Sequence, residues 1–245
     1  MLLRRISQHV REQNWFAVII DFLIVVVGIL IAFQITSWSE QRQENKLEKA
    51  YLHRLATDLD ETINYLKSQD INAAETKTII ENTLAVLNNK DSRDIAVIEA
   101  VTRYISEGTY LQDFKVARTT FDDLSSTGNL GVLHNRALVQ SLGQLHTNFA
   151  DYNEDLLVNT DWILPIESKM AIDFDFFRFD QQTKHLYPNK SSAEILTDIR
   201  AHQDLLQRHA AFHYWYIHNL SIDYQTAIAE TEPVLAMINT ELEAH

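Results

Sequence analysis

Cysteine is absent from the 245-residue chain, and glycine and proline are scarce, with five and three copies. Without cysteine the chain has no disulfide framework, thiolate nucleophile, zinc–thiolate centre or iron–sulfur cluster. Strand-rich folds need many tight turns, which glycine and proline supply, so their scarcity favours long helices. We therefore predict an all-α fold.

Positive charge is the next shortage. The chain has 34 acidic residues against 21 basic ones, which gives a formal net charge of -13. A protein that binds nucleic acid needs a cationic surface to neutralise phosphates, so we expect no nucleic-acid partner. A glycine-rich phosphate loop, a GxSxG nucleophile elbow and an HExxH helix are also missing. We therefore predict no catalytic residue and no cofactor, and the sequence favours a non-enzymatic protein.

The one long hydrophobic run lies near the N-terminus. From Trp15 to Ile35 the chain reads WFAVIIDFLIVVVGILIAFQI, interrupted only by Asp21 and Gln34. A bilayer core about 30 Å thick needs ~20 helical residues. The run is too long for a signal peptide and is not followed by a small-x-small cleavage site. We predict a transmembrane helix over residues 15–38, with Trp15 and Trp38 at the two membrane interfaces.

The charges beside this helix predict its orientation. Arg4, Arg5 and Arg11 precede it with only Glu12 to oppose them, whereas mixed charges follow Ser39. The positive-inside rule then places the N-terminus in the cytoplasm and residues 39–245 outside a bacterial inner membrane. Residues 1–14 are interpreted either as a basic tail or as an interfacial helix on the cytoplasmic leaflet. Membrane lipid is thus the first expected partner.

Asp21, Gly28 and Ala32 share one face of the predicted span. The pair Gly28 and Ala32 permits close helix–helix approach, so we expect a homo-oligomer held partly through the span. A charged aspartate at a helix centre costs about 2.5–3.5 kcal/mol by insertion scales. We interpret Asp21 as an ion or proton site beside a multi-span membrane partner, as an oligomer contact, or as an acid that reaches the interface water.

Residues 39–245 are predicted to form a helical stalk and an extracytoplasmic helical bundle. The stalk helix, 40–68, carries leucine and isoleucine at three–four spacing: Leu52, Leu55, Leu59, Ile63 and Leu66. A second helix is expected at 70–88, and a third runs from an Asp94 cap to Gly108. Thr119 should open a short helix that stops at Gly128.

The C-terminal half contains further helix signals. Asn135 should begin a helix that ends before Pro165. Ser191 to Glu194 fits a capping box for a last helix, about 193–243, which Pro233 bends or divides. Between these helices, 173–179 is interpreted as a short strand or an aromatic loop and 180–190 as a surface loop.

Three histidines in the last helix follow a spacing of seven and four: His202, His209 and His213. On a helix this spacing places them on one side, and the last two have the i, i+4 arrangement of a two-histidine metal pair. A metal ion would need another ligand, for which Asp204 or Glu194 are the nearby candidates. The competing interpretation is a polar stripe that packs beside the aromatic run Tyr214–Tyr216.

Two stretches resemble a family. The first is Gly28-Ile29-Leu30-Ile31-Ala32-Phe33-Gln34 followed by Trp38, and the second is Phe121-Asp122-Asp123-Leu124-Ser125-Ser126-Thr127-Gly128-Asn129-Leu130. Both are similar to an uncharacterised bacterial family of single-span membrane proteins, a domain of unknown function. Members have an acid where Asp21 stands, and asparagines around the tryptophan where this chain has Thr36, Ser37 and Ser39. The resemblance implies membrane attachment and a helical outer domain, and no activity.

These observations lead to one expected function and two alternatives. We expect a membrane-anchored, non-enzymatic scaffold or sensor-type module that forms homo-oligomers. The first alternative is an ion- or proton-coupled auxiliary subunit that uses Asp21. The second is a metal site that depends on the histidines.

Overall fold

The computed structural model describes residues 15–109, 112–173, 177–179, 181–183, 186–188 and 190–244. The predicted tail or interfacial helix at 1–14 lies outside these residues. The side chains of 15–18, 21 and 170–173 and of both short strands are not described either. The predicted all-α class is confirmed, with a long apolar N-terminal helix followed by a helical bundle. Residues up to Tyr51 and residues Leu52–Ala244 form two compact units.

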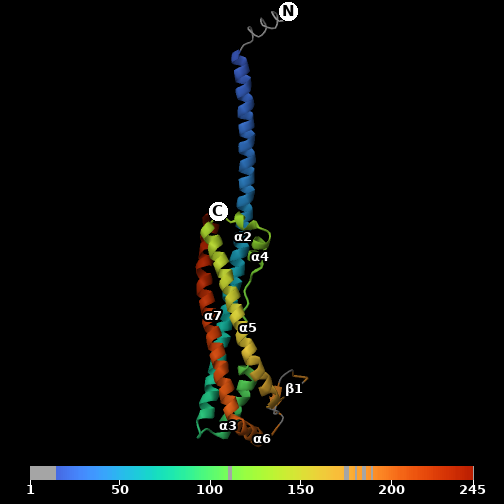
Figure 1. The fold of residues 1–245 in the computed structure, drawn as a ribbon, viewed down its shortest axis with the longest axis vertical. Helices are drawn as coiled ribbons and strands as arrows, with labels where there is room; N and C mark the ends of the chain where they lie inside the picture. The colour runs from blue at the N-terminus through green and yellow to red at the C-terminus, as the bar shows by residue number, and fades with distance from the viewer. Residues whose placement is uncertain are drawn as a thin grey trace, which may run out of the picture. The chain divides into compact units, whose positions relative to one another are not determined.

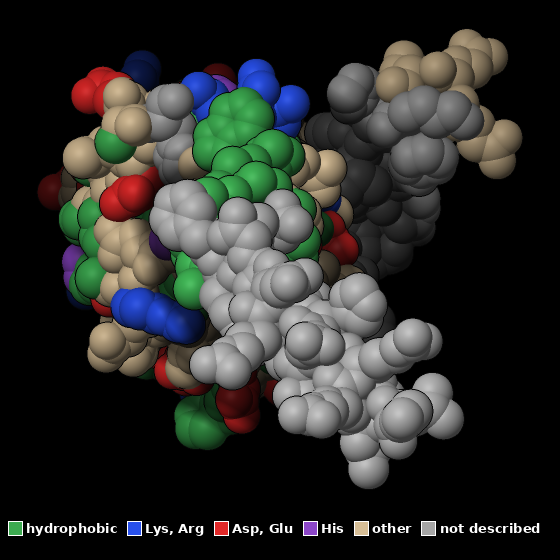
Figure 2. All heavy atoms as spheres, turned by 90° about the horizontal axis from the view of Figure 1, so that it is seen from above, with side chains coloured by type: hydrophobic (Ala, Val, Ile, Leu, Met, Phe, Trp, Pro, Cys, Tyr) green, Lys and Arg blue, Asp and Glu red, His purple; other side chains and the backbone are tan. Residues whose placement is uncertain are grey.

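Helix α2 runs without a break from Trp15 to Asn88. The stalk helix and the helix expected at 70–88 are therefore one helix, because no glycine or proline after Gly28 interrupts it. Its N-terminal part keeps large apolar side chains exposed, with Phe22 at 66%, Phe33 at 69% and Trp38 at 65%. Figure 2 shows hydrophobic side chains gathered in one surface group without acidic or basic side chains inside it.

The exposed part of α2 could span a membrane. It is the one helix among the described residues that is long and apolar enough to do so. Within its 18-residue apolar window, no side chain is buried by the rest of the protein. A soluble helix of this composition would be expected to bury at least one face.

In the unit Leu52–Ala244, α5 (Arg136–Asp173) and α7 (Gln203–Ala244) lie side by side and run antiparallel (Figure 1). α2 contacts α7 through Lys67 and Glu232, whose charged groups are 3.1 Å apart, and through the Ser221 hydroxyl, which donates to Asp70 at 2.6 Å. The predicted hydrophobic stripe of α2 is confirmed, since Leu52, Leu55, Leu59, Ile63 and Leu66 are all buried. A matching buried stripe on α5 consists of Leu138, Leu142, Leu145 and Phe149.

An extended segment, 112–118, returns along α2 to the short helix α4 (Thr119–Ser126). The backbone N–H of Ala117 donates to the Thr62 hydroxyl at 3.0 Å, and that of Thr120 donates to Asp58 at 2.9 Å. Phe114 stacks on Tyr224 of α7 with ring centroids 6.1 Å apart. These bonds satisfy backbone groups that the segment would otherwise bury unpaired.

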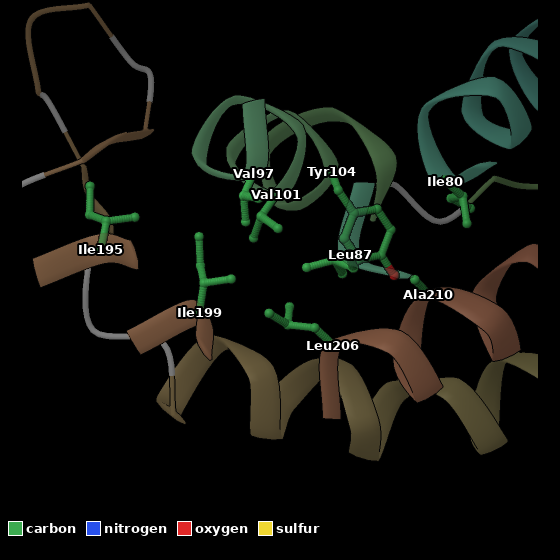
Figure 3. Close-up of a cluster of buried hydrophobic side chains, with 9 residues drawn as sticks. All are labelled: Ile80, Leu87, Val97, Val101, Tyr104, Ile195, Ile199, Leu206 and Ala210. Atoms are coloured by element: carbon green, nitrogen blue, oxygen red, sulfur yellow. The ribbon is translucent and has the colours of Figure 1, made fainter. Parts of the chain in front are cut away.

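At the other end of the bundle, α3 (Asp94–Arg103), the π-helix η1 (Tyr104–Gly108) and α6 (Ser192–Ala201) surround a hydrophobic cluster. Figure 3 shows its side chains converging from these elements, α2 and α7. Its buried members are Ile80, Leu87, Val97, Val101, Tyr104, Ile195, Ile199, Leu206 and Ala210. The helix expected over 94–108 is an α-helix as far as Arg103 and ends as the π-helix η1. Asp94 lies in its first turn, and Arg93 rather than Asp94 holds the N-cap position.

Several predicted helix ends are wrong. α5 continues through Pro165 to Asp173. Of the two alternatives for Pro233, division of the helix is wrong, because α7 runs through it from Gln203 to Ala244. Pro165 has no N–H to donate to the carbonyl of Asp161, and both residues are exposed. The division lies instead at His202, which joins α6 to α7.

Some of the predicted helix caps are confirmed by the structure, and others are wrong. The Asn135 side chain accepts a bond from the Leu138 N–H at 3.1 Å, and Ser191 with Glu194 forms the predicted capping box. Gly128 has the left-handed backbone expected of a helix stop, with φ of 73°. Thr119 is not a cap, because Arg118 holds that position without a side-chain bond. The 3₁₀ helix η2 (Asn129–Val132) follows.

A two-stranded antiparallel sheet joins α5 to α6. Strand β1 (Phe177–Phe179) pairs with β2 (Leu186–Pro188), with Arg178 opposite Tyr187. The strand alternative for 173–179 is thus confirmed at 177–179. The prediction of a surface loop over 180–190 is wrong at β2. The sequence of β2 does not itself indicate a strand, and these residues form one because the hairpin pairs them with β1.

Candidate functional site

The structure separates the three predicted metal-ligand histidines. His202 lies at the C-cap of α6, where its Nδ1 is 2.9 Å from the Asp198 carbonyl oxygen. His209 and His213 project from α7 into the bundle and are 1% and 0% exposed. Neither proposed extra ligand joins them, because Asp204 pairs with Arg208 and Glu194 belongs to the capping box.

The buried histidines instead meet Tyr104 of η1 and Glu167 of α5. The Tyr104 hydroxyl lies 2.6 Å from His209 Nδ1. On the other side of that ring, His209 Nε2 is 3.2 Å from Glu167 Oε1. His213 Nδ1 is 3.6 Å from the same oxygen. We call these four side chains, Tyr104, Glu167, His209 and His213, the buried polar cluster.

Burial keeps the Tyr104 phenol protonated. It raises the pKa of Tyr104 well above its ordinary value, and the Glu167 charge adds to the effect. The protonated phenol can donate a hydrogen bond to His209 Nδ1. His209 Nε2 faces Glu167 Oε1 on the other side of the ring, but neither atom has a hydrogen-bond partner among the described residues. Tyr104, His209 and Glu167 thus lie in one row that crosses from η1 through α7 to α5.

His213 is the least satisfied member. Burial lowers its pKa to about 3, and the neighbouring His209 contributes in the same direction. Neither ring nitrogen of His213 has a hydrogen-bond partner among the described residues. Its ring contacts are aromatic, with Tyr104 at 6.3 Å and Tyr216 at 6.0 Å between centroids. His213 is therefore neutral at pH 7 and packs mainly as an aromatic ring.

The buried polar cluster is too enclosed to receive a substrate. Tyr104 and His213 are 0% exposed, so no reacting molecule reaches their polar atoms without an opening of the bundle. In the described part of the chain, no group of three or more His, Cys, Asp or Glu side chains is arranged to hold a metal ion. The cluster fixes the relative position of α5, α7 and η1, which is a structural task.

An open polar cavity lies on another side of η1. Its volume is about 810 Å³, and α2, α3 and η1 supply its walls together with Gln112. The polar residues of its α2 wall include Gln69, Asn72, Thr76 and Asn82. Cavities of ~300–1,000 Å³ are typical of small-molecule sites. This polar cavity is larger than the open pocket of about 450 Å³ beside Phe114 and Phe149, and it is the candidate site that we consider further.

The remaining predicted site residues lie in α2. Asp21 belongs to the helix, but its side chain is outside the described atoms. Gly28 has open space around it, since an added Cβ would meet no atom within 4 Å. Ala32 is exposed on the next turn of the same face, and Thr36 donates to its carbonyl at 3.0 Å. The face predicted for helix packing is therefore uncovered in the single chain.

Sequence reasoning found two of the four residues of the buried polar cluster. The i, i+4 spacing identified His209 and His213, but Glu167 lies 42 residues before His209 and Tyr104 lies 105 residues before it. The cavity was not foreseen at all, because amides and hydroxyls on an exposed helix face are also what an ordinary solvated surface contains.

No protein-family model, curated protein or solved structure matches this chain. A fold alone does not specify a function. The functional conclusion therefore depends on the geometry of the helix, the cluster and the cavity.

Proposed function

We propose that this protein is a single-pass, membrane-anchored helical module of the scaffold or sensor type, without enzymatic activity. The observation that carries the proposal is the apolar segment of α2, whose 18-residue window contains no buried side chain. Lipid would remove that segment from water, at about 25 cal/mol per Å² of apolar surface. The N-terminus lies in the cytoplasm of a bacterium, and residues 39–245 lie outside its inner membrane. The chain would then belong to the single-span family that it resembles.

The cavity favours a sensor over an inert spacer. Its largest wall is formed by α2 residues between Gln69 and Asn82. The same helix carries the apolar segment nearer its N-terminus, so the cavity and the membrane segment share one continuous backbone. Occupation of the cavity would change the environment of that helix directly.

The membrane anchor is tested with charges placed in the span. We expect the double variant Ile24→Arg, Val27→Arg to lose vesicle binding, because each arginine at a helix centre costs about 2.5–3.5 kcal/mol on insertion. Both side chains are exposed, at 64% and 50%, so the change should not disturb the protein's own packing. Flotation of the full-length chain with lipid vesicles measures the loss.

Ile71→Arg is the matched control for this experiment. Ile71 is an equally apolar residue, 62% exposed, on the part of α2 that belongs to the bundle. This variant should float with vesicles as the parent protein does. Equal flotation of the double variant, or a parent chain that stays soluble without detergent, would contradict the anchor.

Assembly is proposed to depend on the open face at Gly28 and Ala32. We expect Gly28→Leu to lower the cross-linked oligomer fraction in membranes several-fold, because the new side chain holds two helix backbones apart. Val26→Leu, on the opposite side of the helix, should leave that fraction unchanged. Asp21→Asn should also leave the cross-linked oligomer fraction unchanged. If Asp21 is instead an ion or proton site, this variant should lose function and keep its fold. An unchanged fraction in Gly28→Leu would remove the span from the assembly interface.

A further inference from the structure

We propose that the polar cavity between α2, α3 and η1 binds a small, uncharged, hydroxyl-rich molecule, such as a sugar alcohol or a small sugar. This inference names what the proposed sensor module would detect, and in that respect it rests on the proposed function. The binding itself depends only on the cavity. Its volume of about 810 Å³ is ample for one such molecule.

The first support is an unused hydroxyl in the cavity wall. The neighbouring threonines Thr78 and Thr83 donate to the carbonyl oxygens four residues before them, at 2.9 Å each. Thr76 is only 7% exposed, yet its hydroxyl bonds to no group in the described part of the chain. A nearly buried hydroxyl that does not bond back to its own helix is available to a ligand.

Gln112 adds a second unused group to the same cavity. It lines the cavity and is 6% exposed, and its Oε1 has no hydrogen-bond partner among the described atoms. A buried amide oxygen without a partner is costly and rare in folded proteins. Thr76 of α2 and Gln112 of the segment 112–118 therefore both bring unbonded polar atoms to the lining of the cavity.

The charges of the wall select against ions. Arg103 and Glu107 already pair with each other at 3.0 Å, which leaves Glu75 as the other charged side chain of the described lining. An anion would meet the uncompensated Glu75 and compete with Glu107 for the guanidinium. A polycation would find one free carboxylate only. Neutral hydroxyl groups both donate and accept, as do the wall amides of Gln69, Asn72 and Asn82.

The wall chemistry also limits the size and shape of the ligand. No aromatic ring is among the described residues that line the cavity, and Ile79 and Ala100 are their apolar side chains. Recognition by stacking on a flat face is therefore absent, so a short polyol or a single small sugar fits better than a long oligosaccharide. The adjacent π-helix is a second indication, because π-helical turns are frequent at functional sites.

The test is thermal unfolding of the full-length protein in lipid nanodiscs with mannitol, glucose or trehalose at up to 10 mM. We expect at least one of them to raise Tm saturably, by about 5 °C at a hundred-fold excess over Kd. Thr76→Val should abolish most of that shift and leave the unliganded Tm unchanged, since this hydroxyl has no bond to lose. Asn72→Leu, at an exposed wall position, should also reduce it.

Thr83→Val is the matched control on the same helix. Its hydroxyl bonds to the Ile79 and Ala100 carbonyls, so this variant should have a lower Tm and keep the full ligand shift. Non-specific stabilisation by sugars needs far higher concentrations and would act equally on all variants. A missing shift, an equal shift in Thr76→Val, or a shift with glutamate or spermidine alone would overturn the inference. Vesicle flotation tests the anchor separately, so either proposal can fail alone.

Discussion

Lowering the pH from 7 to 4 is expected to reduce the free energy of unfolding of the bundle by roughly 4–6 kcal/mol. The cause is two buried histidines. Burial lowers the pKa of His213 to about 3. It lowers the pKa of His146 to about 4, with Arg118 acting in the same direction. In the folded protein His213 therefore stays mostly neutral down to pH 4, whereas His146 is neutral at pH 7 and about half protonated at pH 4.

The sign follows from proton binding. In the unfolded chain both histidines have a pKa near 6.5, so below that pH the unfolded state holds more protons than the folded state. Stability is present in full above pH 6.5 and is lost as the pH falls toward the folded-state values. Each pKa unit corresponds to about 1.4 kcal/mol.

One carboxyl group acts in the opposite direction. Burial raises the pKa of Asp223 to about 6, and the nearby Asp155 charge adds to the effect. Asp223 is protonated more readily in the folded state, so its contribution to stability grows as the pH falls from 6 to 4. Asp223 is partly exposed, and solvent screens its interactions. The two histidines therefore determine the net direction.

Urea unfolding between pH 4 and pH 7.5 measures the loss. His213→Leu and His146→Leu should each flatten the pH dependence, because a leucine takes up no proton. His218→Leu is the matched control, since His218 is exposed on the same helix as His213 and should keep the parent slope. A parent slope retained in both buried-histidine variants would exclude these rings as the source.

Local periodicity predicted the buried residues well where a neighbouring element covers every turn of the helix. The three–four stripe of α2 from Leu52 to Leu66 and the Asn135 and Ser191 caps depend on residues within one or two turns, and all are confirmed. Pro165 and Pro233 were overestimated as helix ends. Buried residues flank each proline, Ile163 and Val234 among them, and their packing outweighs one lost backbone bond.

The sequence also missed a helix end, because it predicted one continuous helix where the structure divides α6 from α7 at His202. Ile195, Ile199, Leu206 and Ala210 are spaced by four, seven and four, which fits one straight helix. The structure divides the helix there and still places all four in one cluster with α3 and η1. Only the tertiary contacts of α6 with α3 distinguish the two arrangements. The same limit applies to the buried polar cluster, whose four members come from three distant parts of the chain.

Tyr104→Phe is expected to destabilise the protein by about 1–3 kcal/mol, because it leaves a buried ring nitrogen of His209 without its partner. The lost bond is short, at 2.6 Å, and both residues are at most 1% exposed. Figure 3 shows the Tyr104 oxygen directed toward α7 beside Ala210, so no water replaces the hydroxyl there without repacking. Tyr214→Phe is the matched control, since its hydroxyl bonds to Glu81 at the surface and should contribute under about 1 kcal/mol.

A double-mutant cycle with His209→Leu separates this bond from the packing of the tyrosine ring. If the hydroxyl acts through His209, Tyr104→Phe should cost little in the His209→Leu background, and the coupling energy should be about 1–3 kcal/mol. Strictly additive effects would mean that the phenol stabilises the bundle by another contact. Glu167→Gln extends the same cycle to α5. A smaller Tyr104–His209 coupling in that variant would show that Glu167, whose Oε1 lies 3.2 Å from His209 Nε2, helps to hold the His209 ring in place.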